Sequence, residues 1–161
     1  MANIDKNLAF APATELKELI ANKEVSPVEI TQLYLDRIDS LDDQLNSYLT
    51  VTSDLALESA KKAEQAVIDG DDLGPLHGIP ISIKDLQMTK GVKTTGGSLA
   101  YKDRIPDADC AVVERVLSAG AIMLGKTNSP EFGLLGANEN RLADPCRNPW
   151  NTNRTSCLLY T

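Results

Sequence analysis

The chain has 161 residues, of which 42% are hydrophobic and 24% are charged, a composition typical of a soluble globular domain. Its formal net charge of -7 argues against a nucleic-acid backbone or an anionic membrane surface as a direct partner. The aromatic share of 4% is too small for a surface built from several stacking rings. We therefore expect an aliphatic core and no direct binding of nucleic acid.

The cysteines and the single histidine, His77, form no recognisable disulfide or zinc pattern. Residues 1–13 lack the apolar stretch of a signal peptide, and no later run approaches the length of a membrane span. These observations predict a cytoplasmic protein that has no metal, no cofactor and no membrane partner.

Charge and glycine content divide the chain near residue 72. Residues 1–72 contain 15 acidic and 6 basic side chains, whereas residues 73–161 contain 8 acidic and 10 basic side chains. All ten glycines lie between Gly70 and Gly136. This division predicts an acidic helical front segment over 1–72, followed by strands and loops over 73–161.

The front segment predicts three helices and one short strand. Thr14 can cap a first helix that runs to about Lys23. The run Ser26-Pro-Val-Glu29 has the pattern of a capping box with proline at the first helical position, which begins the second helix. The β-prone run 48–51 precedes a third helix over 53–68. The apolar positions expected to face the core are Ile30, Leu33, Tyr34, Ile38, Leu41, Ala56, Ala60, Ala63 and Val67.

In residues 73–161 the spacing of the apolar residues differs from one predicted element to the next. Residues 79–84 alternate, with three isoleucines on one face, as in a strand. Asp107 or Asp109 can cap a helix that ends at Gly120, and the apolar run 121–124 is a second strand. Strand, helix and strand in this order predict a right-handed parallel strand pair. The predicted fold class is α/β, with N-terminal helices that lead into the start of a mixed sheet.

The run Gly120 to Thr127 matches the P-loop pattern G-x-x-x-x-G-K-[ST]. A phosphate site requires a strand, a glycine loop and a helix N-terminus in that order. Here the predicted order is helix, glycine and strand, so we do not predict a nucleotide site.

Lys84 is the residue that the sequence pattern favours as a catalytic group. It ends the predicted strand 79–84 and precedes a polar, glycine-rich stretch over 89–98 that could line a cleft. A lysine partly withdrawn from water loses proton affinity and can act as a neutral base. The structural alternative is a lysine that extends to solvent along its stem or pairs with Asp85. These residues alone leave both interpretations open.

Several motifs follow one another along the chain: Gly74-Pro-Leu-His-Gly-Ile-Pro80, Ser82-Ile-Lys-Asp85, Gly91–Ser98, Gly125-Lys-Thr-Asn-Ser-Pro-Glu-Phe132 and Asn148-Pro-Trp-Asn151. Together they resemble the amidase signature family, and the resemblance covers nearly the whole chain. It implies a mixed α/β sheet flanked by helices, and 73–161 as the first part of this core, continuous with the front segment.

The resemblance also implies an activity. Members of the family cleave carbon-nitrogen amide bonds with a Ser-cisSer-Lys triad and no cofactor, and Lys84 matches their lysine base. The position of Gly133 would lie along the acyl-binding cleft, although 128–133 can also form a capped short helix packed on the sheet. The substrate would be a small-molecule amide. The family includes free amidases and the A subunit of tRNA-dependent amidotransferases, so an oligomer or an amidotransferase complex is possible.

The resemblance stops after Ser156. The family continues Gly-Gly-Ser-Ser-Gly-Gly, whose first serine is the bridging serine, and this chain has Leu159 at that position. We expect the N-terminal part of an amidase that carries the lysine, lacks both serines and is inactive alone. The alternatives are a short non-catalytic interaction module and part of an amidotransferase A subunit. We also expect apolar surface to be exposed along 79–83 and 121–124.

Overall fold

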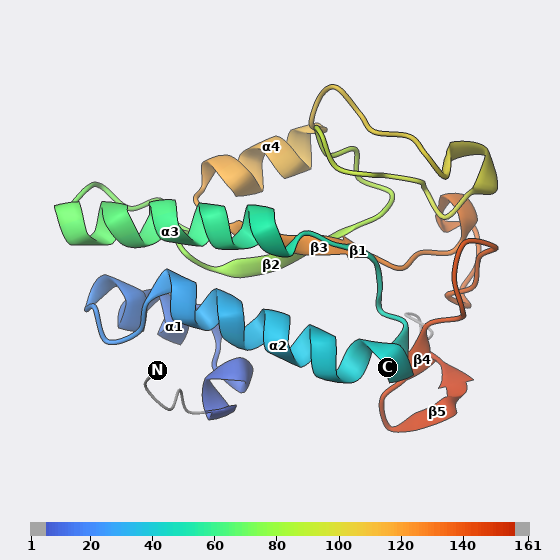
Figure 1. Ribbon diagram of the computed structural model, residues 1–161, viewed down its shortest axis with the longest axis horizontal. Helices are drawn as coiled ribbons and strands as arrows, with labels where there is room; N and C mark the ends of the chain where they lie inside the picture. Colours follow the sequence, from blue (N-terminus) through green and yellow to red (C-terminus); the bar gives the residue numbers. More distant parts are fainter. Residues whose placement is uncertain (1–5, 157–161) are drawn as a thin grey trace. The chain divides into compact units, whose positions relative to one another are not determined.

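The computed structural model describes residues 6–156. Within them, helices lead into a small mixed sheet, which confirms the predicted fold class (Figure 1). The helices are α1 (Ala13–Ala21), α2 (Pro27–Leu45), α3 (Ser53–Asp69) and α4 (Ala111–Ser118), and the short 3-10 helices are η1 (Lys6–Phe10), η2 (Leu99–Tyr101) and η3 (Glu131–Gly133). The strands are β1 (Tyr48–Val51), β2 (Pro80–Lys84), β3 (Ile122–Thr127), β4 (Arg147–Asn148) and β5 (Asn151–Thr155).

The described residues form two compact units. The first unit contains the described residues of Met1–Ile38, with Thr52–Ile81 and Arg115–Leu124. The second unit contains Asp39–Val51, Ser82–Glu114 and the described residues of Gly125–Thr161. Strands β2 and β3 each begin in the first unit and end in the second. The predicted boundary at residue 72 stays a prediction.

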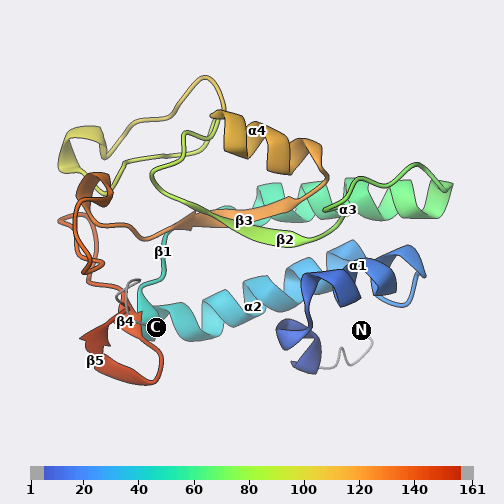
Figure 2. The same cartoon turned by 180° about the vertical axis from the view of Figure 1, so that it is seen from behind.

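The sheet has the strand order β1-β3-β2. At the start of the β2–β3 pair, the amide of Ile122 donates to the carbonyl of Ile79 over 2.9 Å. At its end, the amide of Asp85 donates to the carbonyl of Thr127 over 3.2 Å. The N-terminal ends of the two strands are therefore hydrogen-bonded to each other, and so are their C-terminal ends. Strands β2 and β3 are thus parallel, as predicted, and they lie next to each other in Figure 2. Strand β1 is antiparallel to β3, so the sheet is mixed.

Strand β3 is longer than the predicted 121–124 and continues through Gly125 and Lys126 to Thr127. Glycine is needed here because a Cβ at residue 125 would lie 2.3 Å from the carbonyl oxygen of Thr50. The P-loop-like run therefore ends inside a strand, and it lacks the loop and helix N-terminus that cradle a phosphate.

The core of the first unit forms where helices pack on β2 and β3, and α2 and α3 run side by side (Figure 1). One cluster contains Leu35, Ala56, Ala60, Ala63, Ile122 and Leu124, and the other contains Leu16, Ile20, Ile30, Val67 and Ile79. The predicted alanine-rich face of α3 is confirmed, and its small side chains let α3 approach closely. Leu41, predicted to face the core, is instead 39% exposed.

The expected exposure along 79–83 and 121–124 is wrong. Ile79, Ile83 and all four residues of 121–124 are buried, and Ile81 is half-buried. Helices α1, α2 and α3 supply the apolar side chains that cover Ile79 and Ile122. Exposed apolar surface lies elsewhere, at Leu134, Leu135 and Trp150.

The second helix begins as predicted, and the first and fourth do not. The Ser26 hydroxyl accepts from the Val28 amide over 2.9 Å, and Glu29 accepts from the Ser26 amide over 3.0 Å, which completes the capping box. Helix α1 begins before Thr14, and its N-cap is Pro12, without a side-chain cap. Helix α4 begins at Ala111, which neither predicted aspartate directly precedes.

The reason for the error at α4 is a competing partner. The carboxylate of Asp109 accepts from the amide of Lys90 over 2.6 Å, so it holds a distant loop. Gly120 ends the helix region with a left-handed φ of 93°, as predicted. None of the helices within 6–156 has the length and hydropathy needed to cross a bilayer.

Candidate functional site

The second unit contains a pocket of about 260 Å³ that brings Lys84 and Gly133 together. These are the two site residues that the sequence predicted. The walls are mainly apolar, and the full lining is Lys84, Pro130, Gly133, Leu134, Leu135, Gly136 and Asn138. The described lining includes no serine or threonine hydroxyl. Leu159, at the expected position of the bridging serine, lies outside the described residues.

Lys84 is the last residue of β2 and is half-buried. Its carbonyl accepts from the amide of Gln87 over 2.9 Å, so the chain turns directly after the strand. The next residue, Asp85, is fully buried and is held by the segment that follows the turn. The side chain of Lys84 therefore leaves a backbone that is fixed on both sides by hydrogen bonds.

Asp85 is occupied by partners other than Lys84. Its Oδ2 accepts from the Thr95 amide over 3.0 Å, from the Thr95 hydroxyl and from the Gly97 amide over 3.4 Å. Its Oδ1 is buried and has no hydrogen-bond partner among the described residues. Through these contacts Asp85 holds residues 95–97 close to the end of β2.

Gly133 lies in a short exposed turn rather than in a packed helix. The 3-10 helix Glu131–Gly133 has no side-chain hydrogen bond at its N-cap, and Phe132 is 50% exposed. Gly133 has a φ of +72°, and a Cβ there would lie 2.9 Å from Cδ1 of Leu86. Glycine therefore both permits the turn and keeps the wall of the pocket close to Leu86.

Lys126, which was not predicted as a site residue, lies close to the chain that follows Lys84. It lies on β3 with 0% of its surface exposed. Its Nζ donates to the carbonyl of Gln87, to the Thr89 hydroxyl over 2.7 Å and to the Thr94 hydroxyl over 3.1 Å. Burial lowers the pKa of Lys126 from 10.5 to about 8, and the nearby carboxylate of Asp85 partly opposes this change.

Three serines of the second unit are engaged in hydrogen bonds. The Ser82 hydroxyl pairs with the Tyr48 hydroxyl, and the Ser129 hydroxyl donates to the carbonyl of Pro130 over 3.1 Å. Ser98 donates to the Glu131 carboxylate over 2.5 Å. The described residues thus place a half-buried lysine at a mainly apolar pocket.

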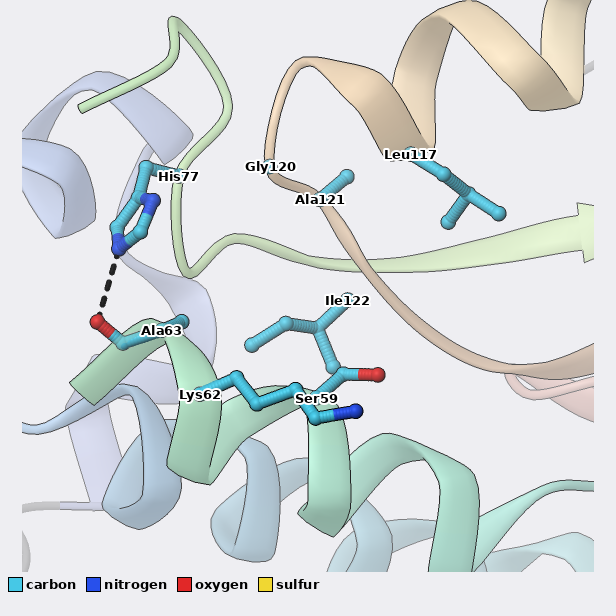
Figure 3. Close-up of a pocket in the computed structure, with 8 residues that line it drawn as sticks. All are labelled: Ser59, Lys62, Ala63, His77, Leu117, Gly120, Ala121 and Ile122. Atoms are coloured by element: carbon cyan, nitrogen blue, oxygen red, sulfur yellow. Dashed lines mark hydrogen bonds between the residues drawn. The ribbon is translucent and has the colours of Figure 1, made fainter. Parts of the chain in front are cut away.

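A second pocket, of about 350 Å³, lies in the first unit (Figure 3). Its walls come from α3, from the chain before β2 and from the junction of α4 with β3, and they include Leu117 and Ile122. The ring nitrogen Nε2 of His77 lies 2.9 Å from the carbonyl oxygen of Ala63, and Lys62 is paired with Glu58 at 2.6 Å. Because its histidine and its lysine already have partners, this pocket is the weaker candidate for a reaction.

Known proteins resemble this chain in both sequence and fold. The family model described as Amidase matches residues 29–157, so this chain, a mixed α/β structure with a lysine at the end of a parallel strand, belongs to the amidase family. The chain is 40% identical over 147 residues to the A subunit of the glutamyl-tRNA(Gln) amidotransferase of Carboxydothermus hydrogenoformans, covering 91% of this chain and 30% of the relative. The protein of the same name from Methylococcus capsulatus is 45% identical over 138 residues, covering 86% and 28%.

A solved structure of an amidase also resembles this chain. The peptide amidase from Stenotrophomonas maltophilia superposes with a TM-score of 0.85 at 32% identity, covering 94% of this chain and 32% of that enzyme. The resemblance to the amidase signature family is therefore confirmed. The chain spans about 30% of the length of the curated relatives that it matches.

Proposed function

We propose that Lys84 is the general base of an amidase that cleaves carbon-nitrogen amide bonds, and that Gly133 lies along its acyl-binding cleft. The observation that carries the proposal is the pocket that both residues line, although they are far apart in the sequence. Membership of the amidase family supports the reaction class.

In the proposed mechanism, neutral Lys84 accepts a proton from a bridging serine, which accepts one from a nucleophilic serine. The nucleophile attacks the amide carbonyl, and the carbon-nitrogen bond breaks as a proton passes to the leaving amine or ammonia. Water then hydrolyses the acyl-enzyme. Backbone amides of a glycine-rich loop stabilise the oxyanion, a contribution of about 3 to 4 kcal/mol.

Both serines must be supplied from outside these 161 residues, because the sequence has Leu159 at the position of the bridging serine. Leucine has no proton to relay. We therefore expect the 161-residue polypeptide, assayed alone, to hydrolyse no amide. Hydrolysis that a serine reagent blocks and that Lys84→Ala abolishes would contradict this expectation.

The activity itself is tested in a chimera. Residues 1–156 are joined to the part of the Stenotrophomonas peptide amidase that follows the matching segment, and ammonia release from a peptide amide is measured. We expect turnover that Lys84→Ala lowers by about 10²- to 10⁴-fold and that Lys90→Ala, at an exposed lysine, preserves. Equal turnover in the Lys84→Ala chimera would exclude Lys84 as the base.

A second candidate is part of an amidotransferase A subunit, and the identities of 40% and 45% to two such proteins favour it. The corresponding chimera joins residues 1–156 to the remainder of the Methylococcus protein. Restored transamidation in the presence of that enzyme's other subunits, together with inactivity of the peptide amidase chimera, would favour the amidotransferase over the free amidase.

A further inference from the structure

The most completely buried cation of the second unit is outside the pocket but next to the turn that carries Lys84. Lys126 is fully buried, and all three of its hydrogen-bond acceptors, on Gln87, Thr89 and Thr94, belong to one segment. A lysine ammonium has three donors, so each donor has a partner. Lys126 is not among the residues that line the pocket.

Two consecutive hydrogen bonds connect Lys126 with Lys84. The Nζ of Lys126 donates to the carbonyl of Gln87, and the amide of Gln87 donates to the carbonyl of Lys84 over 2.9 Å. A third bond, from the Asp85 amide to the Thr127 carbonyl over 3.2 Å, joins the same turn to the residue after Lys126. Asp85 and Gln87, both in the turn that follows Lys84, are thus each hydrogen-bonded to a residue of β3.

Asp85 completes the arrangement from the other side. Its buried carboxylate holds Thr95 and Gly97, and its carbonyl accepts from the Gly96 amide over 3.1 Å. The segment 85–97 is therefore anchored by two buried residues of opposite charge, Lys126 at 87–94 and Asp85 at 95–97. A buried charge is costly unless its hydrogen bonds are made, and Lys126 makes three with this segment. Moving 87–94 would leave the buried ammonium without partners, so this part of the segment has one strongly preferred conformation.

We propose that Lys126 is a positioning residue, which fixes the turn 84–87 on β3 and thereby holds the Lys84 side chain in the pocket that it shares with Gly133. This inference rests on the proposed function of Lys84 as the base. Lys126 touches no substrate in this account and acts only through Gln87, Thr89 and Thr94.

The test uses the 161-residue chain and reads the position of Lys84, not activity. In Lys126→Met, which keeps the apolar stem and removes the donors, we expect the Gln87 amide to exchange with solvent about tenfold faster, a factor that corresponds to about 1.4 kcal/mol. We also expect loss of the nuclear Overhauser contacts that the Lys84 side chain makes in the parent with other residues of its pocket. The Ala60 amide, in the core of the first unit, serves as the internal reference.

Lys90→Met is the matched control, because Lys90 is an exposed lysine in the same segment. It should leave the Gln87 exchange rate and the Lys84 contacts unchanged. If Lys126→Met does not fold, the double variant Thr89→Val and Thr94→Val removes two acceptors at nearly constant volume and should produce the same local changes.

A folded variant whose Lys84 contacts and Gln87 exchange match the parent would overturn the proposal. So would a uniform acceleration at Gln87 and Ala60, because that result describes a purely global loss of stability. A wrong assignment of Lys84 as the base would give a different pair of results. The spectra of Lys126→Met would still show that Lys84 moves, but the Lys84→Ala chimera would turn over as fast as its parent.

Discussion

Lys126 on β3 donates a hydrogen bond to the hydroxyl of Thr89 over 2.7 Å, and neither side chain is open to solvent. This bond crosses from the strand to the loop that follows Lys84. It places a cationic group in the interior, where a charge is less well solvated than in water. The stability of the chain should consequently depend on the protonation of Lys126.

The pH dependence follows from the pKa of Lys126, which burial lowers from 10.5 to about 8. Between these values the unfolded chain holds a proton that the folded chain lacks, so stability rises as pH rises from about 8 towards 10.5. The charges of Asp85, Cys110 and Asp109 raise this pKa and that of Arg104 lowers it. The gain is at most about 3 kcal/mol.

Denaturant unfolding of the parent and of Lys126→Met at pH 7.5 and pH 10.5 measures this effect. Groups that titrate in both proteins cancel in the difference between them. The free energy of unfolding of the parent should increase relative to that of the variant at the higher pH. A difference that stays constant, or that changes in the variant's favour, would show that Lys126 is not buried as a weakened base.

Gly133 and Gly91 form a matched pair for testing the wall of the pocket. Their φ angles are +72° and +71°, but a Cβ at 133 would meet Leu86 at 2.9 Å whereas nothing lies within 4 Å of one at 91. Alanine at either position should cost about 1 kcal/mol for the backbone alone. Because Cδ1 of Leu86 is the end of a flexible side chain that can move aside, we expect Gly133→Ala and Gly91→Ala to lose similar stability in denaturant unfolding, and a clearly larger loss at 133 would show that Leu86 is held rigidly against the turn.

Ser26 and Thr14 test which helix starts depend on a side-chain cap. Ser26→Ala removes the acceptor that bonds the Val28 amide at 2.9 Å and should cost about 1 kcal/mol in thermal or denaturant unfolding. Thr14→Ala should leave stability nearly unchanged, because the N-cap of α1 is Pro12. The assignment of the caps fails if the two substitutions cost the same.

Local patterns predicted most of the elements. The capping box at Ser26, the alanine face of α3, and the strands on either side of α4 depend on residues close in the sequence, and each is present. The glycine at 120 also ends the helix region in the predicted way. Such features are determined by backbone geometry and side-chain periodicity, which the sequence displays directly.

The errors have a common physical cause in distant contacts. Asp109 matches a helix cap locally, but the amide of Lys90 competes for its carboxylate. Lys126 lies beyond the predicted strand 121–124, and the pairing of β3 with β1 shows that it is a strand residue. Leu41 has helical spacing and still points to solvent, since the helix is longer than the core that covers it.

The candidate site, too, could be predicted from the sequence only in part. Lys84 and Gly133 were predicted from motifs that resemble a family, and the structure brings both to one pocket. Lys84 directly precedes the loop that Asp85 and Lys126 hold by hydrogen bonds. No local pattern in the sequence marks Thr89 and Thr94 as partners of Lys126, because these contacts link residues that are more than thirty positions apart.

The central claim is that Lys84 is the base, and the rate of ammonia release by the chimera of residues 1–156 with the Stenotrophomonas peptide amidase tests it most directly. Lys84→Ala should lower kcat by about 10²- to 10⁴-fold, the usual contribution of general base catalysis, while circular dichroism remains unchanged. Lys90→Ala should keep the rate of the parent chimera. A folded Lys84→Ala chimera that releases ammonia as fast as its parent would contradict the claim.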